Sequence, residues 1–443
     1  MLVSLEGQEA GLRMDETAET RWRAHREAGT RAYRLGQYGK AKSHYLAALR
    51  EAERPGSQDD KVVDSYWDLV ELYRRQDRVV EAEQTCQKLL ALQEQRLGPE
   101  HPDLAGTLHS LAGCRGELGL PDEGESLHRR ALAILESAFG RDRPELVGSL
   151  HALALHCFSR QRYAEAEQQW KRALATLEQV PTEAPRPIPD VAAVLSCLSM
   201  THSAAGRHAD AEAVLRREIA FAEQKGEDAL TLGGLFEKMA AACAAQGRHA
   251  EADSLYRQAL ASHERWLSNV LRSKRFRGPE RARSRDSFRR RFGYCRGTIL
   301  HSNAASLREL GRADEAARME VRAEALLVRA LAHEEEQRRV DGLTTVCYLQ
   351  ALAAAFRAQG KYSEAEPLYR RVLAIHQVEA DRRLARLKGR QYAAARDRVR
   401  ETLAFQVAPV LRRYASVLRA LGRADEADQG EGRAERLRVR CGR

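Results

Sequence analysis

The 443-residue sequence is poor in residues that interrupt helices or favour strands. It has 12 prolines, and its aromatic residues are limited to 4 Trp, 13 Tyr and 9 Phe, whereas Ala, Leu, Glu and Arg are frequent. Proline breaks helices, aromatic residues favour strands, and the four frequent residues favour helices. The composition therefore excludes an all-β fold and favours an all-α one.

Long hydrophobic runs are also missing. The uncharged stretch 343–356 contains Thr, Tyr and Gln and is shorter than the roughly 18 apolar residues of a membrane span. The N-terminal segment carries Glu6 and Glu9 in place of the basic start and apolar core of a secretory signal. None of the eight cysteines forms a C-x-x-C pair. We therefore expect a cytoplasmic protein that does not associate with membranes.

Motifs of catalytic and metal sites are absent as well. The sequence has no G-x-x-x-x-G-K-[ST], no G-x-S-x-G and no H-E-x-x-H. Cys157 and Cys243 fall within apolar stripes and read as core residues, and Cys295 has no recognisable His or acidic partner. We predict no catalytic residue, no cofactor and no metal site, so that the protein is not an enzyme.

One pattern is repeated nine times: a helix with small residues, a Gly-x-aromatic turn, and a second helix. Clear copies of the turn region are R-Y-A-E-A-E (162–167), R-H-A-E-A-D (248–253) and K-Y-S-E-A-E (361–366). The period is near 42 residues, with longer connections late in the chain. A small residue recurs just after each turn, where the second helix is expected to cross the first; these residues are Ala41, Ala82, Gly124, Ala166, Ala211, Ala252, Ala316, Ala365 and Ala427.

Each copy predicts a helical hairpin whose two helices approach closely. The first helix of the fourth copy, for example, carries Leu150, Leu153, Ala154 and Cys157 at the i, i+3, i+4, i+7 spacing of one helical stripe. Close approach requires small side chains at the crossing and large ones beside it. A single hairpin cannot bury such a stripe, so neighbouring hairpins must stack into a solenoid.

At these residues the sequence resembles the tetratricopeptide repeat (TPR) family, over about residues 21–440. The junctions L-G-P-E-H-P-D-L-A-G-T-L (97–108) and F-G-R-D-R-P-E-L-V-G-S-L (139–150) are similar to those of the kinesin-light-chain-like subtype. The resemblance implies an all-α, right-handed superhelical solenoid of about nine helix-turn-helix hairpins. It also implies a concave groove that is lined by the first helices and holds partner peptides.

The resemblance places one residue of each first helix in that groove. Histidine recurs at this place, and the paired asparagines frequent in the family are replaced, for example by His109-Ser110. Either these side chains recognise a partner peptide through hydrogen bonds, or they only solvate the groove. The predicted groove residues are Arg26, Trp67, His109, His151, Ser196, Glu237, His301, Gln350 and Arg412.

The predicted organisation follows the repeats and the two longest spacings between them. The degenerate ninth copy has Glu431 where Trp or Tyr stands in clearer copies. The segments are an N-terminal lead-in without fixed structure (1–20), repeats one to six (21–270), a basic Arg- and aromatic-rich insertion (271–296), repeats seven and eight (297–375), a second, partly helical basic insertion (376–400), and the ninth repeat with a capping helix (401–443).

The net charge of +10 is concentrated in the two insertions. Residues 272–296 contain eleven Arg or Lys against two acids, and residues 381–400 contain eight against two. Such segments suit an acidic protein or single-stranded nucleic acid, and they also occur as ordinary solvated helices. The predicted basic edge consists of Arg272, Lys274, Arg275, Arg277, Arg289, Arg290, Arg291, Arg382, Arg383, Arg386 and Lys388.

Together these patterns predict a non-enzymatic scaffold or adaptor that binds a partner protein or peptide in the groove, with an acidic partner as one option. One alternative is a nucleic-acid-binding protein that uses the insertions, although nucleic acid is the less favoured partner. The other alternative is a regulatory or sensor subunit of an enzyme encoded nearby. The oligomeric state does not follow from the sequence.

Overall fold

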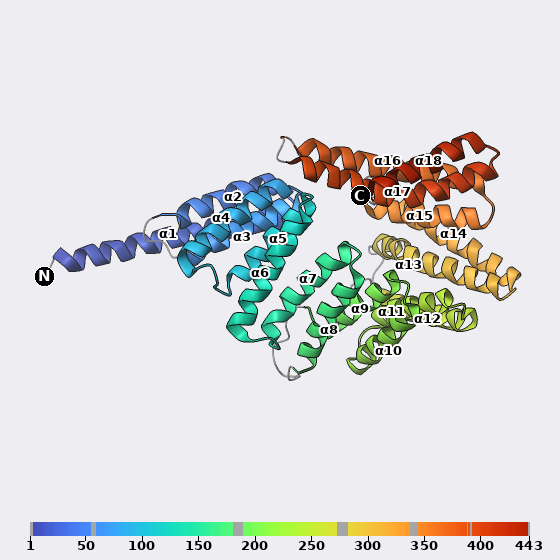
Figure 1. Cartoon of the computed structure of the whole chain (residues 1–443), viewed down its shortest axis with the longest axis horizontal. Helices are drawn as coiled ribbons and strands as arrows, with labels where there is room; N and C mark the ends of the chain where they lie inside the picture. The colour runs from blue at the N-terminus through green and yellow to red at the C-terminus, as the bar shows by residue number, and fades with distance from the viewer. Residues whose placement is uncertain are drawn as a thin grey trace. The chain divides into compact units, whose positions relative to one another are not determined.

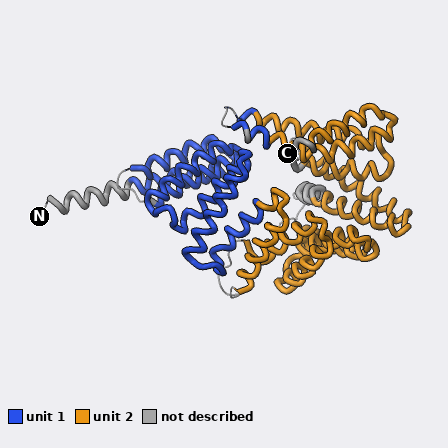
Figure 2. The backbone as a smooth tube through the Cα atoms, in the orientation of Figure 1, with its two compact units in different colours: residues 1–156, 385–398 blue, residues 157–384, 399–443 orange. Residues whose placement is uncertain are grey.

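The computed structural model describes residues 3–54, 59–179, 189–272, 282–336, 343–387, 389 and 392–441, with the backbone alone at 3–17, 59, 282–291, 343–344, 394 and 438–441. In this part of the chain every regular element is helical, which confirms the predicted all-α fold. The chain divides into two compact units, Met1–His156 with Ala385–Arg398 and Cys157–Leu384 with Val399–Arg443 (Figure 2).

The described helices form nine hairpins, each consisting of an odd-numbered first helix and the even-numbered second helix that follows it (Figure 1). The first four are α1 (Val3–Arg34) and α2 (Tyr38–Ala52), α3 (Asp59–Arg75) and α4 (Val79–Leu97), α5 (Leu104–Glu117) and α6 (Pro121–Phe139), and α7 (Val147–Ser159), preceded by the 3-10 turn η1 (Pro144–Leu146), and α8 (Tyr163–Gln179).

The other five hairpins are α9 (Val191–Ala204) and α10 (His208–Gln224), α11 (Ala229–Ala245) and α12 (His249–Arg272), α13 (Ala282–Glu309) and α14 (Ala313–Glu336), α15 (Leu343–Ala358) and α16 (Tyr362–Arg386), and α17 (Ala393–Ala420) and α18 (Ala424–Cys441). The number of hairpins agrees with the nine copies of the sequence pattern. None of these helices, over the described residues, has the length and apolar character needed to cross a membrane.

The nine turns that join first to second helices share one backbone geometry. A residue with positive φ stands in each turn; it is glycine in seven of them, such as Gly247 (φ 76°), and Asp77 (φ 55°) and Gln161 (φ 60°) in the other two. The next residue donates its N–H to the carbonyl five residues back, as Arg248 does to Cys243 at 3.0 Å. Glycine adopts this left-handed conformation at no steric cost, which explains the glycine of the repeated pattern.

The small residue after each turn is fully enclosed. The eight alanines predicted at this place are all 0% exposed, and Gly124 is buried. A Cβ atom built on Gly124 would stand 2.8 Å from the carbonyl oxygen of Ala112. Because that oxygen belongs to the backbone of α5, it cannot rotate away as a side chain would. The third hairpin therefore requires glycine at this place to keep its helices at their present distance.

We expect the Gly124→Ala substitution to destabilise the first unit by about 1–3 kcal/mol, because the added methyl group forces α5 and α6 apart. The matched control is Gly113→Ala on α5, where a Cβ atom would meet nothing within 4 Å. That change should be neutral or stabilise by up to about 1 kcal/mol, since alanine is the better helix former. Urea unfolding measures both, and equal effects would contradict the assignment of the crossing point.

Large side chains fill the space beside the crossings and join successive hairpins. In the first unit, one buried cluster contains Trp22 of α1, Leu72 of α3 and Cys114 of α5. In the second unit, another contains Leu215 of α10 and Ile299 of α13. Each cluster thus takes residues from three neighbouring hairpins, which is how repeats that are too thin to bury a core alone become stable.

The segments predicted as lead-in and insertions are largely helical. Helix α1 begins at Val3, which differs from the expected lead-in without fixed structure. Helix α12 continues to Arg272 and α13 starts at Ala282, while α16 continues to Arg386 and α17 starts at Ala393. The long spacings between repeats therefore come mainly from lengthened helices. The remaining residues of the first insertion, 273–281, lie outside the described part of the chain.

Aromatic packing holds the lengthened helices α12 and α13 together. The rings of Trp266 and Phe292 stack with their centroids 5.1 Å apart, and His263 lies 5.4 Å from Phe292. Trp266 also donates its indole N–H to the carboxylate of Asp228 at 2.9 Å. Because Trp266 continues the apolar stripe of α12, burying it favours extension of both helices over a loop.

Candidate partner-binding groove

All nine predicted groove residues lie on first helices. In the first unit they are Arg26 on α1, Trp67 on α3, His109 on α5 and His151 on α7. In the second unit they are Ser196 on α9, Glu237 on α11, His301 on α13, Gln350 on α15 and Arg412 on α17. Their surroundings decide which of them can meet a partner.

Arg26 is engaged inside the first unit. Its guanidinium donates to Asp64 at 2.5 Å and to Asp68 at 2.7 Å, both on the neighbouring first helix α3. It also lies 5.3 Å from the ring centroid of Trp22. Trp67 of α3 lies against the next first helix in turn, since a Cβ atom on Gly106 would stand 3.6 Å from its ring. Both residues therefore link successive hairpins.

His109 belongs to a cluster of three histidines from α5, α6 and α7. Its Nδ1 shares a hydrogen bond with Nδ1 of His128 at 2.9 Å, and its Nε2 shares one with the hydroxyl of Ser149 at 2.6 Å. The ring of His128 in turn lies 5.5 Å from that of His156. Burial lowers the pKa of His109 to about 4. Burial, reinforced by the neighbouring histidines, lowers the pKa of His128 to about 3.

The histidine cluster is consequently neutral near pH 7 and serves the packing of the third and fourth first helices. Burial also lowers the pKa of His151, which lies five residues before His156 on α7. Over the residues that the structure describes, no group of three or more His, Cys, Asp or Glu is arranged to hold a metal ion.

In the second unit, the first helices α9 and α11 are joined by a polar contact. Lys238 donates to the hydroxyl of Ser196 at 2.9 Å. Beside it, burial raises the pKa of Glu237 to about 7, with Lys238 opposing the shift. No hydrogen bond to the Glu237 carboxyl is present among the described residues. Gln350 is half-buried, and Arg412 is exposed, with its Nη2 atom 4.0 Å from a carboxylate oxygen of Glu435.

His301 lines an open cavity of about 600 Å³ between α11, α12 and α13, which we call the α11–α13 notch. The walls combine methyl groups with polar side chains from all three helices. The lining residues are Ala241, Ala244, His249, Tyr256, His301, Ser302, Ala305, Ser306 and Glu309.

Two imidazole nitrogens in the notch have no hydrogen-bond partner. The Nδ1 atoms of His249 and His301 are both buried and unpaired in the described structure. Burial, with Arg308 and Arg357 acting in the same direction, lowers the pKa of His301, so its ring is neutral near pH 7. Burial also raises the pKa of Tyr256 to about 12, which keeps its hydroxyl protonated. Unpaired buried polar atoms are costly, so they mark a place where a ligand gains by supplying partners.

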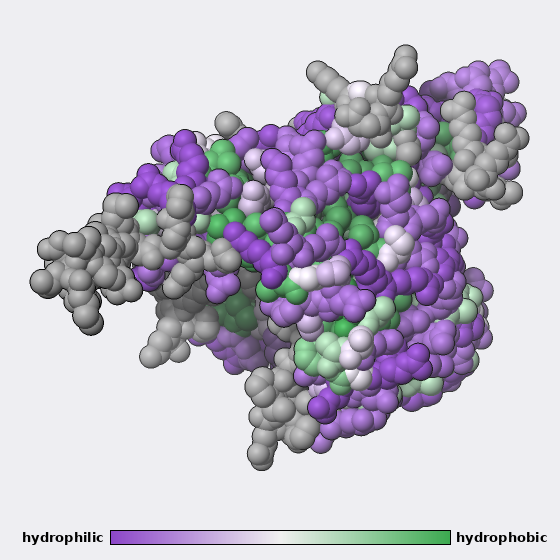
Figure 3. Space-filling view, turned by 60° about the vertical axis from the view of Figure 1, so that its left-hand side comes forward, coloured by the Kyte–Doolittle hydropathy of each residue, from purple (hydrophilic) through white to green (hydrophobic). Residues whose placement is uncertain are grey.

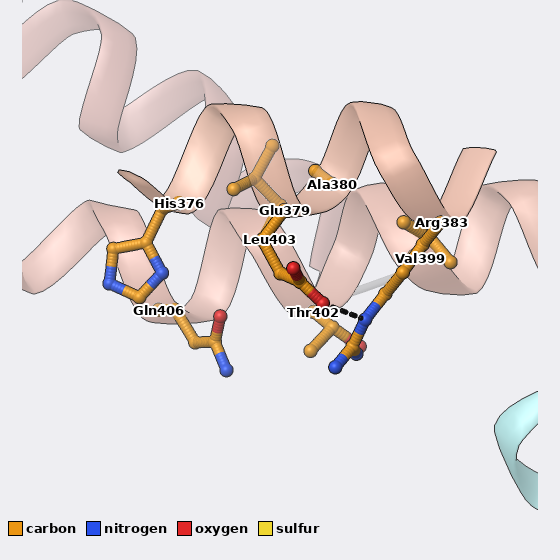
Figure 4. A pocket seen from close by; sticks show the side chains of 8 residues that line it. All are labelled: His376, Glu379, Ala380, Arg383, Val399, Thr402, Leu403 and Gln406. Atoms are coloured by element: carbon orange, nitrogen blue, oxygen red, sulfur yellow. Dashed lines mark hydrogen bonds and ion pairs between the residues drawn. The ribbon is translucent and has the colours of Figure 1, made fainter. Parts of the chain in front are cut away.

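A second cavity lies between α16 and α17 and is far smaller. His376 and Gln406 face each other at one end of it, and Arg383 donates to Glu379 at 3.0 Å at the other (Figure 4). Its volume of about 20 Å³ holds little more than one water molecule. Of these two cavities, the α11–α13 notch is the one large enough to receive a side chain.

Known protein families and solved structures match this chain over the repeated hairpins. Profiles of the tetratricopeptide repeat family match residues 61–120 and 103–179, 238–268, and 349–383. These matches include α3 to α8, the α11–α12 hairpin and the α15–α16 hairpin, whose turns have the geometry found in all nine hairpins. The chain is a tetratricopeptide repeat protein.

Solved structures similar to this TPR protein include a kinesin light chain of Podosopora anserina with nearly identical TPR-like repeats (22% identity, 48% of this chain and 97% of that one, TM-score 0.42). They also include BtubC (BKLC) from P. vanneervenii (21% identity, 49% of this chain and 92% of that one, TM-score 0.41). Aspartyl phosphate phosphatase F from Bacillus subtilis is similar at 11% identity over 95% of both chains, with a TM-score of 0.48. No curated protein matches the chain.

The two junctions that suggested the kinesin-light-chain-like subtype have matching conformations in this TPR protein. Helix α4 ends at Gly98 (φ 92°, ψ 161°) and α6 ends at Gly140 (φ 92°, ψ 166°). Each of the two glycines donates its N–H to the carbonyl four residues back, which caps the helix. Positive φ at both places explains why glycine recurs in the junction sequence.

Much of the predicted basic edge lies outside the described side chains. This holds for Lys274, Arg275, Arg277, Arg289, Arg290, Arg291 and Lys388. Of the others, Arg272 donates to the carbonyl of Ser268 at 3.2 Å, and Arg386 donates to the carbonyl of Asp77 at 2.7 Å. Arg382 is exposed, and Arg383 pairs with Glu379. The described arginines are thus partly occupied by their own chain, and a single basic patch stays a prediction.

Ion pairs between successive TPR hairpins were not anticipated from the sequence. The arginine before a second helix reaches back to an acid of the preceding second helix. The pairs are Arg207–Glu167 (2.6 Å), Arg248–Glu212 (2.6 Å), Arg312–Asp253 (2.8 Å) and Arg423–Glu366 (2.7 Å). Each acid directly follows the crossing alanine, and each arginine directly follows the turn glycine. The recurrent G-R-x-x-[DE]-A-[DE] spacing is the signal that could have predicted them.

Proposed function

We propose that this TPR protein is a scaffold that holds a segment of a partner protein along the first helices of its second unit. The observation that carries the proposal is the α11–α13 notch, an open cavity of about 600 Å³ with unpaired polar atoms in its walls. TPR scaffolds bind proteins and are typically not enzymes, and the sequence contains no recognisable catalytic motif.

An apolar stripe leads along the same helices. Met200 on α9, Ala241 on α11 and Ala305 on α13 occupy equivalent places, four residues after Ser196, Glu237 and His301 respectively. All three are exposed, and Met200 is 50% exposed although it is a large apolar residue. Equivalent places in stacked repeats form a row, so a partner segment that crosses the row would bury one apolar residue of each hairpin.

The notch supplies specificity in this scheme, and the stripe supplies contact area. On the face shown in Figure 3, hydrophobic residues form separate areas among hydrophilic ones. Small apolar areas with polar neighbours suit a reversibly bound segment, whereas permanent partners bury larger apolar surfaces. The first unit contributes less to recognition because Arg26 and His109 are committed to contacts within it.

Affinity capture with blocked variants tests the proposal. The Ala305→Tyr substitution places a large ring in the notch at an exposed position, so we expect it to abolish capture of a partner from the cells that make the protein, without unfolding the chain. The matched control is Ala325→Tyr, an equally exposed alanine on α14. A partner recovered by the wild type and the control at low and high salt, but not by Ala305→Tyr, supports the proposal. Equal recovery by all three proteins would refute it.

A further inference from the structure

The chemistry of the α11–α13 notch determines which side chain it accepts. Among its lining residues the notch has one carboxylate, Glu309, and no Lys or Arg. It also has the hydroxyls of Tyr256, Ser302 and Ser306. The two unpaired Nδ1 atoms, of His249 and His301, complete the set of polar groups. A neutral imidazole carries its proton on either nitrogen, so the Nδ1 atom of the neutral His301 can accept a hydrogen bond.

The notch is therefore rich in acceptors and carries negative charge. A carboxylate from a partner would be repelled by the carboxylate of Glu309. An apolar side chain would leave the buried nitrogens of His249 and His301 unpaired, as they already are in the free protein. A side chain with several N–H donors and a positive charge can instead bond to the imidazoles and hydroxyls and pair with the carboxylate.

A second carboxyl group adds to this preference. Glu237 precedes Ala241 by four residues, about one turn of α11, so both residues lie on the same face of the helix. Its charge acts on Tyr256, whose ring lines the notch. Its carboxyl has no hydrogen bond among the described residues, and burial raises its pKa to about 7 against the opposing effect of Lys238, so an incoming cation would favour its charged form.

The nearest cations do not cancel this charge. Arg308 and Arg357 act on His301. Arg308 is turned away, since it donates to the carbonyl of Ala358 at 3.0 Å and pairs with Glu320. That leaves Arg357, with Lys238 beside Glu237, against the two carboxyl groups of Glu237 and Glu309. Burial, together with Arg308 and Arg357, lowers the pKa of His301 and so keeps its ring neutral and able to accept a hydrogen bond.

We infer that the α11–α13 notch binds an arginine side chain of the partner segment. The guanidinium pairs with Glu309 and donates to His249 and His301, while its methylene stem lies on the methyl groups of Ala241, Ala244 and Ala305. Arginine fits better than lysine because its planar group presents five donors in fixed directions to acceptors on three helices. This inference rests on the proposed function and adds the chemical class of the partner residue.

Histidine-detected NMR of the full chain tests the inference. With the protein labelled at histidine Cε1, the probe is the capped tripeptide acetyl-Gly-Arg-Gly-amide. We expect it to shift the signals of His249 and His301, assigned from single His→Gln variants, with a Kd on the order of 1 mM. The matched probe has citrulline, which keeps the shape and loses the charge, and should bind at least about tenfold more weakly. A glutamate tripeptide should give no shift.

Variants separate the site from non-specific attraction. Glu309→Gln should weaken binding of the arginine probe about five- to tenfold. Ala305→Tyr should remove the shifts of the histidine signals, and Ala325→Tyr should leave these shifts unchanged. Equal binding of the arginine and citrulline probes, or preference for glutamate, would overturn the inference. If a captured partner depends on the Ala305 position while both probes bind alike, the scaffold function stands and the arginine assignment fails. If the arginine probe binds as expected but capture of a partner does not depend on the Ala305 position, the notch binds arginine and the scaffold function fails.

Discussion

Replacing Ala252 by arginine should destabilise the second unit by about 3–5 kcal/mol. Ala252 is 0% exposed at the crossing of α11 and α12. An arginine there must separate the two helices and bring an unpaired charge into a cluster formed by Leu215, Met239 and Ile299 among others. Overpacking and burial of an unpaired charge are among the few mechanisms that produce effects of this size.

The matched control is Ala250→Arg on the same helix. Ala250 is exposed two residues earlier, so its arginine can extend into water, and we expect a change within about 0.5 kcal/mol. Urea unfolding followed by circular dichroism measures both variants. Hydrogen exchange should show faster opening of α10 to α13 in Ala252→Arg, because each hairpin depends on its neighbours. Similar unfolding curves for the two variants would show that Ala252 does not mark a helix crossing.

The crossing residues could be predicted because the rule that selects them is local. A left-handed turn residue, a crossing alanine or glycine and a stripe of apolar residues all occur within about 20 neighbouring positions of the sequence. Such rules repeat with every hairpin, so even degenerate copies reveal them. Ala427 of the ninth copy is as fully buried as Ala166 of the fourth.

The notch and the histidine cluster could be predicted only in part, because they depend on contacts between helices of different hairpins. Alignment of the first helices placed His109 and His301 at one equivalent position. It could not show that His128, on a second helix, shares a hydrogen bond with His109, while His301 lies in an open cavity. The difference arises from neighbours: several Ala and Ser residues line the cavity beside His301, whereas His128 and Ser149 form hydrogen bonds with His109.

The lengthened helices could be predicted in part, since the apolar stripe of α12 continues through Trp266 and the second insertion was expected to be partly helical. The basic composition of residues 272–296 and 381–400 favours solvated segments in general. The structure instead continues α12 and α13 because Trp266 and Phe292 stack on each other. A single aromatic pair, 26 residues apart in sequence, cannot be identified as a contact without knowledge of where both helices run.

The histidine cluster makes the first unit sensitive to acid. The pKa values of His109 and His128 are lowered to about 4 and about 3, whereas an unfolded chain has histidines near 6.5. Between these values the unfolded state binds more protons than the folded state. The free energy of unfolding therefore decreases as the pH falls through 6.5 and continues to decrease until the folded-state values are reached.

For His109 alone, the free energy of unfolding should decrease by about 3 kcal/mol between pH 7 and pH 4. His128 increases it, although the two titrate together because they share a hydrogen bond. Glu125 opposes the shift of His128 to a small extent. Above pH 6.5 neither histidine changes its charge, so His109 does not act as a switch under neutral conditions.

Urea unfolding of the wild type at pH 7, 6, 5 and 4 measures this effect against the double variant His109→Leu/His128→Leu. Because both histidines are replaced, no buried imidazole is left without its hydrogen-bond partner, so the variant should fold. Carboxylates titrate alike in both proteins, which means that the difference between their pH dependences isolates the two histidines. We expect the free energy of unfolding of the variant to fall by at least about 3 kcal/mol less than that of the wild type between pH 7 and pH 4. Parallel curves, or histidine Cε1 signals of residues 109 and 128 that titrate near 6.5, would show that the cluster is not buried in solution.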